Sequence, residues 1–412
     1  MTTSRPHASS PADVIEVHLS SNGEQSVNDF RVLLVGAGLG GLVAALALRR
    51  EGFQVDVYEQ TAVLGEVGAG LSLSLGAQDA LSEVGVLEAV RSKASVTRHL
   101  ARLHYKTGQL LSGAVDDSDG TSADPPGATV PTGLQIHRAD LHELLLSAVR
   151  ACGAGIHLNR RYVDCSEREA GVAAHFSDGS QAVGDVLIGA DGLRSEVRAQ
   201  LWGREEPRWT GQVAFRSVLP TSLVAPLLGA GGRAAVYYGP GRTFNRYTLR
   251  RGAILNCVGI ARTDSWEGEG WTTPASRDEL SALYEGWHGD LCELIDRLPD
   301  GSLMKWALFD REPLSRWRQG AVTLLGDAAH PMLPFLGLGA AMAIEDGLAL
   351  ARALTKDPGP VGLDAYEELR RPRTTEVMLA SRLEGQLVQG RDPSELTLGE
   401  IPSFNRRFYE SA

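Results

Sequence analysis

The sequence predicts an α/β fold in which a parallel-sheet domain is interrupted by a β-rich insertion. Three apolar runs at residues 32–35, 186–188 and 322–325 each end at a glycine or lead to an aspartate. Such runs are typical of parallel strands buried on both faces. Between the second and third runs the alternation of strands and helices stops, and short alternating segments predict a mixed or antiparallel sheet.

The first run leads into a glycine-rich turn and then a helix. Gly36 permits the turn, Gly38 leaves room for a pyrophosphate, and Gly41 lets the helix pack closely on the strand. A second strand ends at Glu59, close to the spacing, roughly 20 residues, at which an acid binds a ribose hydroxyl. This order predicts a dinucleotide site, whereas the glycines alone would equally fit a tight turn between strand and helix.

Composition sets bounds on the function. The chain has 412 residues, 43% hydrophobic and 22% charged, as in ordinary globular proteins. A formal net charge of -11 argues against nucleic acid or an anionic membrane surface as a partner, and no apolar run is long enough to span a membrane. The four cysteines lack metal-binding spacing, which predicts no metal site and a cytoplasmic location.

The domain organisation follows from changes along the chain. Residues 1–29 are rich in serine and proline and lack a signal sequence, so they are expected to form a loosely ordered leader. The remaining boundaries are expected at 30–95, 128–201 and 318–360 for the nucleotide-binding domain, at 96–127 and 202–317 for the β-rich domain, and at 361–412 for a C-terminal helical segment.

Three local features are expected within the nucleotide-binding domain. Apolar spacing predicts one helix over residues 77–90. Asp140 is placed to cap a helix at residues 141–149. Residues 182–188 read as one strand that leads toward the second glycine motif.

Two further motifs place aspartates at the ends of apolar strands. A GADG segment carries Asp191, and Ser195 is placed to cap the helix that follows. A GDAAHP segment carries Asp327 and precedes a proline-stiffened loop and a long helix. Ligands bind at the carboxyl ends of strands in open α/β sheets, and helix starts favour negative charge. An ordinary strand, turn and cap would explain Asp191 equally well.

In this order and spacing, the three motifs resemble the single-component FAD-dependent aromatic hydroxylases, in particular the branch of salicylate, 3-hydroxybenzoate and 6-hydroxynicotinate hydroxylases. The resemblance covers residues 31–382. It implies a discontinuous Rossmann-like FAD-binding domain, an inserted substrate domain and C-terminal helices. It also implies FAD as cofactor, NAD(P)H and O2 as co-substrates, a flavin C4a-hydroperoxide as oxygen donor, a small carboxylated phenol or hydroxypyridine as substrate, and a monomer or homodimer.

The resemblance also implies which residues bind the cofactor. Gly36, Gly38 and Gly41 are expected to contact the pyrophosphate, Glu59 the adenosine ribose, and Val163 the adenine. Arg138 is expected to contact the phosphate or ribityl region, Asp327 the ribityl chain, and Asp191 both FAD and the pyridine nucleotide. The isoalloxazine is expected to contact Gly339, Ala340 and Ala341.

Three residues are candidates for the chemistry. His330 lies between Asp327 and the proline loop, so it could take the proton of a phenol, although it could also fill the turn. Pro334 is expected to form a rigid wall of the oxygen pocket. Gln212 and Phe215 stand where the family often has a histidine and a tyrosine, so the usual acid/base partner would be replaced.

The β-rich domain supplies the substrate candidates. Phe215 and Arg216 match a family segment, and Arg216, Arg246, Arg233 or Tyr247 could pair with a substrate carboxylate. Each of them taken alone is more often structural. A second glycine fingerprint is absent, so the resemblance implies that NAD(P)H binds transiently on the FAD domain.

Two other functions are compatible with the same residues. Epoxidation or another oxidation would keep the fold and change the chemistry. A non-catalytic FAD-binding protein would keep the cofactor site and lack substrate turnover.

Overall fold

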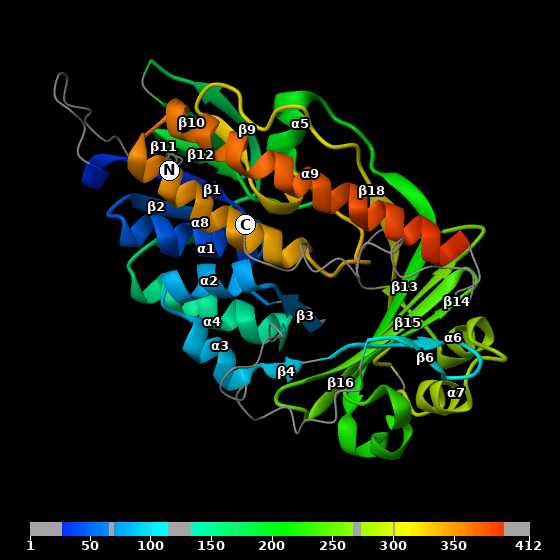
Figure 1. Cartoon of the computed structure of the whole chain (residues 1–412). Coiled ribbons are helices and arrows are strands. Elements are labelled where there is room, and N and C mark those ends of the chain that lie inside the picture. The colour runs from blue at the N-terminus through cyan, green and yellow to red at the C-terminus, as the bar shows by residue number, and fades with distance from the viewer. Residues whose placement is uncertain are drawn as a thin grey trace, which may run out of the picture.

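The computed structural model describes residues 27–65, 70–97, 99–113, 133–169, 171–266, 273–299 and 301–390. A parallel sheet with its helices lies on one side and a broad mixed sheet on the other, and the long helix α9 (Pro360–Gly390) runs from one to the other (Figure 1). Of the predicted leader, residues 1–26 lie outside the described residues.

The parallel sheet is the centre of the first domain. Its strands lie in the order β19-β12-β1-β2-β8, all parallel. Apolar side chains fill both of its faces, as expected for such sheets. The strands are β1 (Arg31–Val35), β2 (Gln54–Tyr58), β8 (Gly155–His157), β12 (Val186–Gly189) and β19 (Val322–Leu324).

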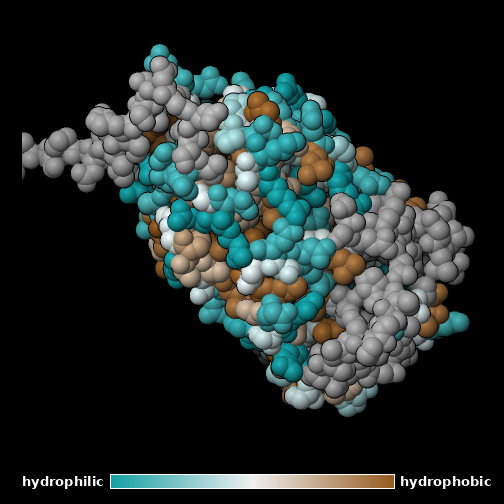
Figure 2. Space-filling model, turned by 60° about the vertical axis from the view of Figure 1, so that its left-hand side comes forward, coloured by the Kyte–Doolittle hydropathy of each residue, from teal (hydrophilic) through white to brown (hydrophobic). Residues whose placement is uncertain are grey.

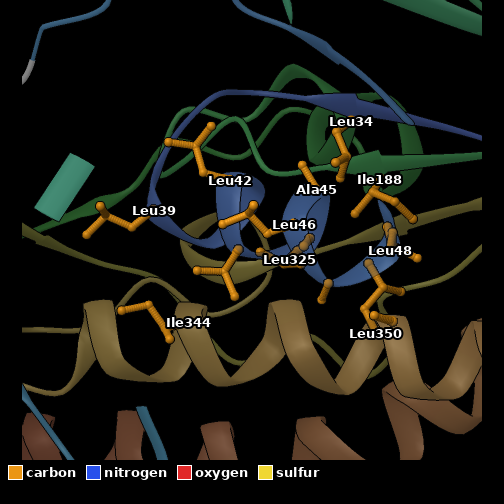
Figure 3. Close-up of a cluster of buried hydrophobic side chains, with 14 of the residues drawn as sticks. Leu34, Leu39, Leu42, Ala45, Leu46, Leu48, Ile188, Leu325, Ile344 and Leu350 are labelled. Atoms are coloured by element: carbon orange, nitrogen blue, oxygen red, sulfur yellow. The ribbon is translucent and has the colours of Figure 1, made fainter. Parts of the chain in front are cut away.

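Helix α1 (Leu39–Arg50) packs on this sheet, and α8 (Gly339–Lys356) packs on α1 (Figure 3). A Cβ atom on Gly347 would lie 2.7 Å from the backbone nitrogen of Ala44, and one on Gly40 would lie 2.9 Å from the carbonyl of Ala343. Glycine at both positions therefore lets the two helix backbones approach. The other helices of this part are α2 (Leu75–Glu83), α3 (Leu87–Lys93), α4 (Arg138–Ala151) and α5 (Glu196–Trp202).

Two small antiparallel sheets border the parallel one. The first has the order β3-β7-β4 and the second the order β11-β10-β9. Phe176 of the second stacks on Tyr58 of β2 with 4.6 Å between ring centroids. The strands are β3 (Gly70–Leu73), β4 (Ser95–Thr97), β7 (Gly133–His137), β9 (Tyr162–Glu167), β10 (Val172–Phe176) and β11 (Gln181–Gly184).

The large mixed sheet has the order β17-β18-β13-β16-β15-β14-β5-β6. Helices α6 (Arg277–Leu283) and α7 (Gly289–Asp296) cover one of its faces, where Tyr284 packs on Phe244. Its other face is turned toward the first domain. The strands are β5 (Ala101–His104), β6 (Leu110–Ser112), β13 (Arg208–Pro220), β14 (Ala234–Gly239), β15 (Arg242–Leu249), β16 (Ile254–Arg262), β17 (Thr273–Pro274) and β18 (Met304–Asp310).

Short 3-10 turns complete the described chain. They are η1 (Val27–Asp29), η2 (Thr221–Leu223), η3 (Ala225–Leu227), η4 (Gly229–Gly231) and η5 (Gly326–Ala328). The predicted α/β class, with a parallel sheet and a separate β-rich part, is confirmed. The exact domain boundaries stay a prediction.

The predicted helix over residues 77–90 is wrong. The chain forms α2 and α3 instead, because Gly85 between them has φ +76°, which ends a right-handed helix. The strand expected over residues 182–188 is likewise two strands in different sheets. Asp185 separates them and accepts a hydrogen bond from the backbone N–H of Arg31 at 2.6 Å.

The predicted capping role of Asp140 is also wrong. Helix α4 begins at Arg138, with His137 at its N-cap, so Asp140 lies inside the first turn. There it accepts two hydrogen bonds of 2.9 Å from the guanidinium of Arg250, at the end of β15. Asp140 therefore joins the two parts of the molecule.

The described helices include none that is both long enough and apolar enough to cross a bilayer. On the face in Figure 2, the described surface is mostly hydrophilic and its hydrophobic residues form scattered small areas. This surface is typical of a face in contact with water.

Replacing Gly36 by alanine is expected to lower the free energy of unfolding by about 3 kcal/mol. Gly36 has φ +109°, and a Cβ atom would lie 2.4 Å from the carbonyl oxygen of Ala190. Gly179 has φ +85° with no atom within 4 Å of its Cβ position, so Gly179→Ala isolates the backbone cost and should cost about 1 kcal/mol. Urea unfolding of the FAD-free protein measures both. Equal losses would contradict the importance of the close approach.

Candidate functional site

A cavity of about 350 Å³ lies between the parallel-sheet domain and the inner face of the large sheet. One half is lined by the glycine turn, by Arg138 and by the loop and helix start at residues 325–340. The other half is lined by side chains of β14, β15, β16 and β18, among them Asn245, Ile260 and Trp306. A polar, backbone-rich wall therefore faces one that is apolar on β16 and β18 and carries polar groups on β15.

The glycine turn has the geometry that its sequence predicts. The N–H of Gly36 donates to the carbonyl of Tyr58 at 2.8 Å, and a Cβ atom on Gly41 would lie 2.4 Å from the carbonyl of Gly36. Gly38 differs, since nothing lies within 4 Å of its Cβ position. The turn is thus packed on its inner side and open on the side of the cavity, where the N–H groups that begin α1 favour an anion.

Side chains from two elements hold the peptide of Ala37 in this turn. Its N–H donates to the Glu59 carboxylate at 3.0 Å. Its carbonyl lies 2.8 Å from Nε2 of the buried His142, which must therefore carry the proton. His142 lies one helical turn after Arg138 on α4, so a single helix supports the turn and supplies a cation to the cavity.

The GADG segment contributes backbone to the cavity. Ala190 and Gly192 line it, while the Asp191 carboxylate points to α5 and accepts from Ser195 Oγ at 2.5 Å and from the N–H of Glu196 at 2.8 Å. Ser195 caps α5 as predicted, accepting from the N–H of Arg198 at 2.9 Å. Burial raises the pKa of Asp191, although the hydrogen bonds oppose this shift.

Asp327 lines the cavity at the end of β19. Its side chain is open to the cavity but lies deep in the molecule, and this burial raises its pKa against the opposing charges of His330 and Arg138. The turn that carries it is anchored from behind, because the N–H of Gly326 donates to Asp346 at 3.2 Å.

Asp346 is the centre of a buried polar cluster behind this turn. It accepts from His330 Nε2 at 2.5 Å and from Arg370 Nε at 2.7 Å, and Arg370 also pairs with Glu345 at 3.1 Å. Burial by itself would raise the pKa of Asp346, but the charges of His330 and Arg370 outweigh it and hold the pKa below its usual value. The cluster ties the turn to α8 and α9.

The family model of the FAD binding domain matches residues 29–381. The chain belongs to this family. It is 34% identical over 358 residues, 86% of this chain and 87% of the relative, to a 3-amino-4-hydroxybenzoate 2-monooxygenase of Streptomyces platensis. It is 32% identical to a 6-hydroxynicotinate 3-monooxygenase of Pseudomonas fluorescens, over 88% of this chain and 93% of the relative.

The fold is shared with a solved structure described as a salicylate hydroxylase substrate complex. The two have a TM-score of 0.74 and 27% sequence identity, over 89% of this chain and 90% of the other. The predicted family is therefore confirmed, and the chain is an FAD-dependent aromatic monooxygenase.

The cavity fits FAD. The open position at Gly38, the N–H groups of α1 and the charge of Arg138 suit a pyrophosphate. Gly339 and Ala340 line the cavity at the start of α8, where the helix dipole favours an electron-rich edge of a flavin. Most of the residues predicted for the cofactor thus meet around one space. Those that line it are Gly38, Gly41, Arg138, Asp327, Gly339 and Ala340, together with Pro334 of the proline loop.

Five of the predicted cofactor residues do not line the cavity, one of them Asp191, whose carboxylate points to α5 as described above. Gly36 and Glu59 lie directly behind the turn, where they shape it. Ala341 is fully buried behind Ala340. Val163 is 51% exposed on β9, close in sequence to Arg160, whose N–H donates to the carbonyl of Glu59 at 2.8 Å.

The catalytic interpretation of His330 does not agree with the structure. Its side chain is buried, it does not line the cavity, and its ring packs on Trp317 with 5.4 Å between centroids. Its hydrogen bond to Asp346 fixes the turn that carries Asp327. His330 is therefore a structural residue, as the turn-filling alternative anticipated.

The substrate candidates separate by the face of the sheet on which they lie. Phe215 is buried in the core beneath α6 and α7, and Arg246 lies behind the sheet, donating to the carbonyls of Gly232 and Leu228 at 2.6 Å each. Both predictions are wrong for this reason. Arg216 lies on the cavity side, with its guanidinium carbon 5.0 Å from the ring centroid of Trp306.

Two more candidates have other positions. Gln212 lines a second cavity, described below, and Arg233 does not line the first one.

The sequence interpretation missed Thr243 and Asn245, which line the first cavity with Tyr247. Their spacing of two residues along β15 was the available signal.

Replacing His142 by leucine is expected to weaken FAD binding about tenfold, because the Ala37 carbonyl would be left buried without its donor. His142→Gln keeps a donor and should restore much of the affinity. Quenching of flavin fluorescence on titration of FAD-free protein measures the dissociation constant. Leu145→Ala, one turn further along α4 and equally buried, is the matched control, and it should lower stability without this loss. Equal affinities of the leucine and glutamine variants would contradict the assigned role.

Replacing Asp346 by asparagine is expected to lower the free energy of unfolding at neutral pH by about 3 kcal/mol, since the buried Arg370 would lose one of its two carboxylate partners. The folded-state pKa of Asp346 lies below its ordinary value. Its contribution is therefore complete above about pH 4 and is lost as the pH falls further. The variant should accordingly show a shallower loss of stability below about pH 4. Urea unfolding across the acid range measures this, and an unchanged slope would refute it.

Proposed function

We propose that this protein hydroxylates a small aromatic ring that carries a hydroxyl group and a carboxylate, or the corresponding hydroxypyridine, with NAD(P)H and O2 as co-substrates. The supporting observation is one cavity in which a cofactor wall faces a substrate wall. Asp327, Pro334 and Gly339 lie on the first, and Ile260 and Trp306 on the second. The names of the relatives support the substrate class.

Bound FAD would be held by the glycine turn, Arg138 and Asp327, and after its reduction by NAD(P)H it would activate O2, one atom of which goes to the ring and the other to water. The protein must then keep water out of the cavity. Leu333 and Phe335 of the proline loop line it on one side and apolar residues of β16 on the other. Pro334 stiffens the loop between them, so this part of the wall keeps its shape.

Polar groups on β15 would orient the substrate. Thr243, Asn245 and Tyr247 line the same wall. Burial raises the pKa of the Tyr247 phenol, so it stays protonated and is able to donate a hydrogen bond to a bound substrate. Gly70 makes room for this ring, since a Cβ atom there would lie 2.3 Å from it.

Arg216 is the cation we assign to the substrate carboxylate. It lies over Trp306, which lines the cavity. Its charge acts on Tyr247, on the same wall. Arg216 does not itself line the cavity, but a guanidinium held over a lining aromatic ring suits an aromatic acid, because it pairs with the carboxylate while the ring packs against the substrate.

The test uses FAD-loaded protein with NADH and NADPH, and 3-amino-4-hydroxybenzoate, 6-hydroxynicotinate and salicylate as substrates. At least one acid is expected to accelerate NAD(P)H oxidation by about tenfold or more, because a bound ring fills the cavity and is positioned for the reaction. One hydroxylated product should form per NAD(P)H oxidised. Product is identified by mass, and peroxide is assayed in parallel. Acceleration that yields peroxide alone, or no acceleration by any aromatic acid, would count against the proposal.

A further inference from the structure

A second cavity of about 380 Å³ lies beside the first, at the ends of β13, β16 and β18 and under α9. The lining of this second cavity is mostly polar, whereas the part of the first cavity formed by β16 and β18 is apolar. Three arginines and two glutamines contribute to it, together with the ring of Trp209. They are Arg208, Arg262, Arg382, Gln212 and Gln386. The cofactor wall and the substrate wall described above leave this cavity without a role.

The two cavities share one face of the large sheet. Along β16, Ile260 lines the first cavity and Arg262, two residues later, lines the second. Along β18, Trp306 lines the first and Asp310 the second. Residues an even number of positions apart lie on the same face of a strand. The second cavity is therefore a polar continuation of the floor on which the substrate would lie.

The side chain of Leu333 separates the two cavities, since it lines both. Its backbone is fixed, because its carbonyl accepts from Ser381 Oγ of α9 at 2.6 Å. Phe335 of the same loop packs tightly on Gly385, which lines the second cavity. The loop is thus anchored to α9, and the partition between the cavities consists of side chains, which change rotamer far more readily than a backbone moves.

The charges of the second cavity favour an anion. Asp310 is buried and already pairs with Arg208 at 3.0 Å and with Arg382 at 2.7 Å. The same two arginines also pair with Glu312, at 3.8 Å and 3.1 Å, so the charge that remains available in this cavity is that of Arg262. Arg262 is exposed, and its guanidinium has no ion-pair partner among the described residues. A carboxylate could pair with Arg262, an aromatic ring could lie on Trp209, and Gln212 could bond a ring hydroxyl.

We propose that the second cavity is an antechamber that captures an aromatic carboxylate from solution and passes it around Leu333 into the first cavity. The inference rests on the proposed function, which makes such acids the substrates. The net charge of -11 gives the protein a field that repels an anionic substrate. A local cationic entrance counters this repulsion and raises the rate of association.

The experiment measures association rates by stopped flow, following the change in flavin absorbance when FAD-loaded protein meets salicylate or 6-hydroxynicotinate at low salt. Phenol is the uncharged comparison. Arg262→Glu is compared with Lys106→Glu, which makes the same change of charge at an exposed residue that lines neither cavity. Arg262→Gln removes the charge without reversing it. All three substitutions alter exposed side chains, so the fold is retained.

Arg262→Glu is expected to slow association of the acids about five- to tenfold relative to Lys106→Glu, and Arg262→Gln about threefold, because the attraction at the entrance is lost. The rate for phenol should be unchanged, and the difference should shrink as salt is added. Equal rates in Arg262→Glu and Lys106→Glu would overturn the antechamber and leave the proposed function standing. If neither acid changes the flavin absorbance of the unaltered protein, the proposed function is contradicted, and the antechamber proposal, which rests on it, is contradicted as well.

Discussion

The backbone-to-backbone packing at the glycine turn is the constraint on which the rest of the structure depends. Gly36 approaches Ala190, and Gly41 approaches the carbonyl of Gly36, at distances that exclude any side chain. The strand β1, the start of α1 and the end of β12 are thereby held in one fixed arrangement. Gly38, whose Cβ position is empty, remains the point where a ligand could reach the backbone.

Hydrogen bonds extend this arrangement to the third strand end. The N–H of Ala190 donates to Val35 at 2.8 Å, and the N–H of Leu325 donates to Gly189 at 2.9 Å. Three segments that are far apart in sequence therefore end at one edge of the parallel sheet, as ligand sites in open α/β sheets require. The Asp346 cluster then fixes the third turn to α8 and α9, and the large sheet closes the cavity from the opposite side.

The parts of this site that the sequence predicts are those set by local geometry. The glycine turn, the cap at Ser195 and the start of α8 depend on neighbouring residues, and they have the expected form. His330 could not be assigned in this way, because its partner Asp346, and the Arg370 that pairs with Asp346, lie on helices further along the chain. A sequence pattern does not show which distant side chain completes such a cluster.

The substrate candidates show a second limit. Gln212 and Phe215 lie an odd number of positions apart, so a regular strand directs them to opposite faces. The register of β13 also shifts between Trp209 and Val213. Which face meets the cofactor depends on where α6 and α7 pack, and this is a long-range property. Once the buried face is known, the alternation explains why Arg246 lies behind the sheet and Tyr247 in the cavity.

The most direct measurement of the central claim is a crystal structure of the protein with FAD. The account predicts the pyrophosphate at Gly38 and the start of α1, and the flavin ring in the part of the cavity lined by Asp327, Pro334 and Gly339. Electron density for the ring outside this cavity, or a pyrophosphate bound away from the glycine turn, would contradict it.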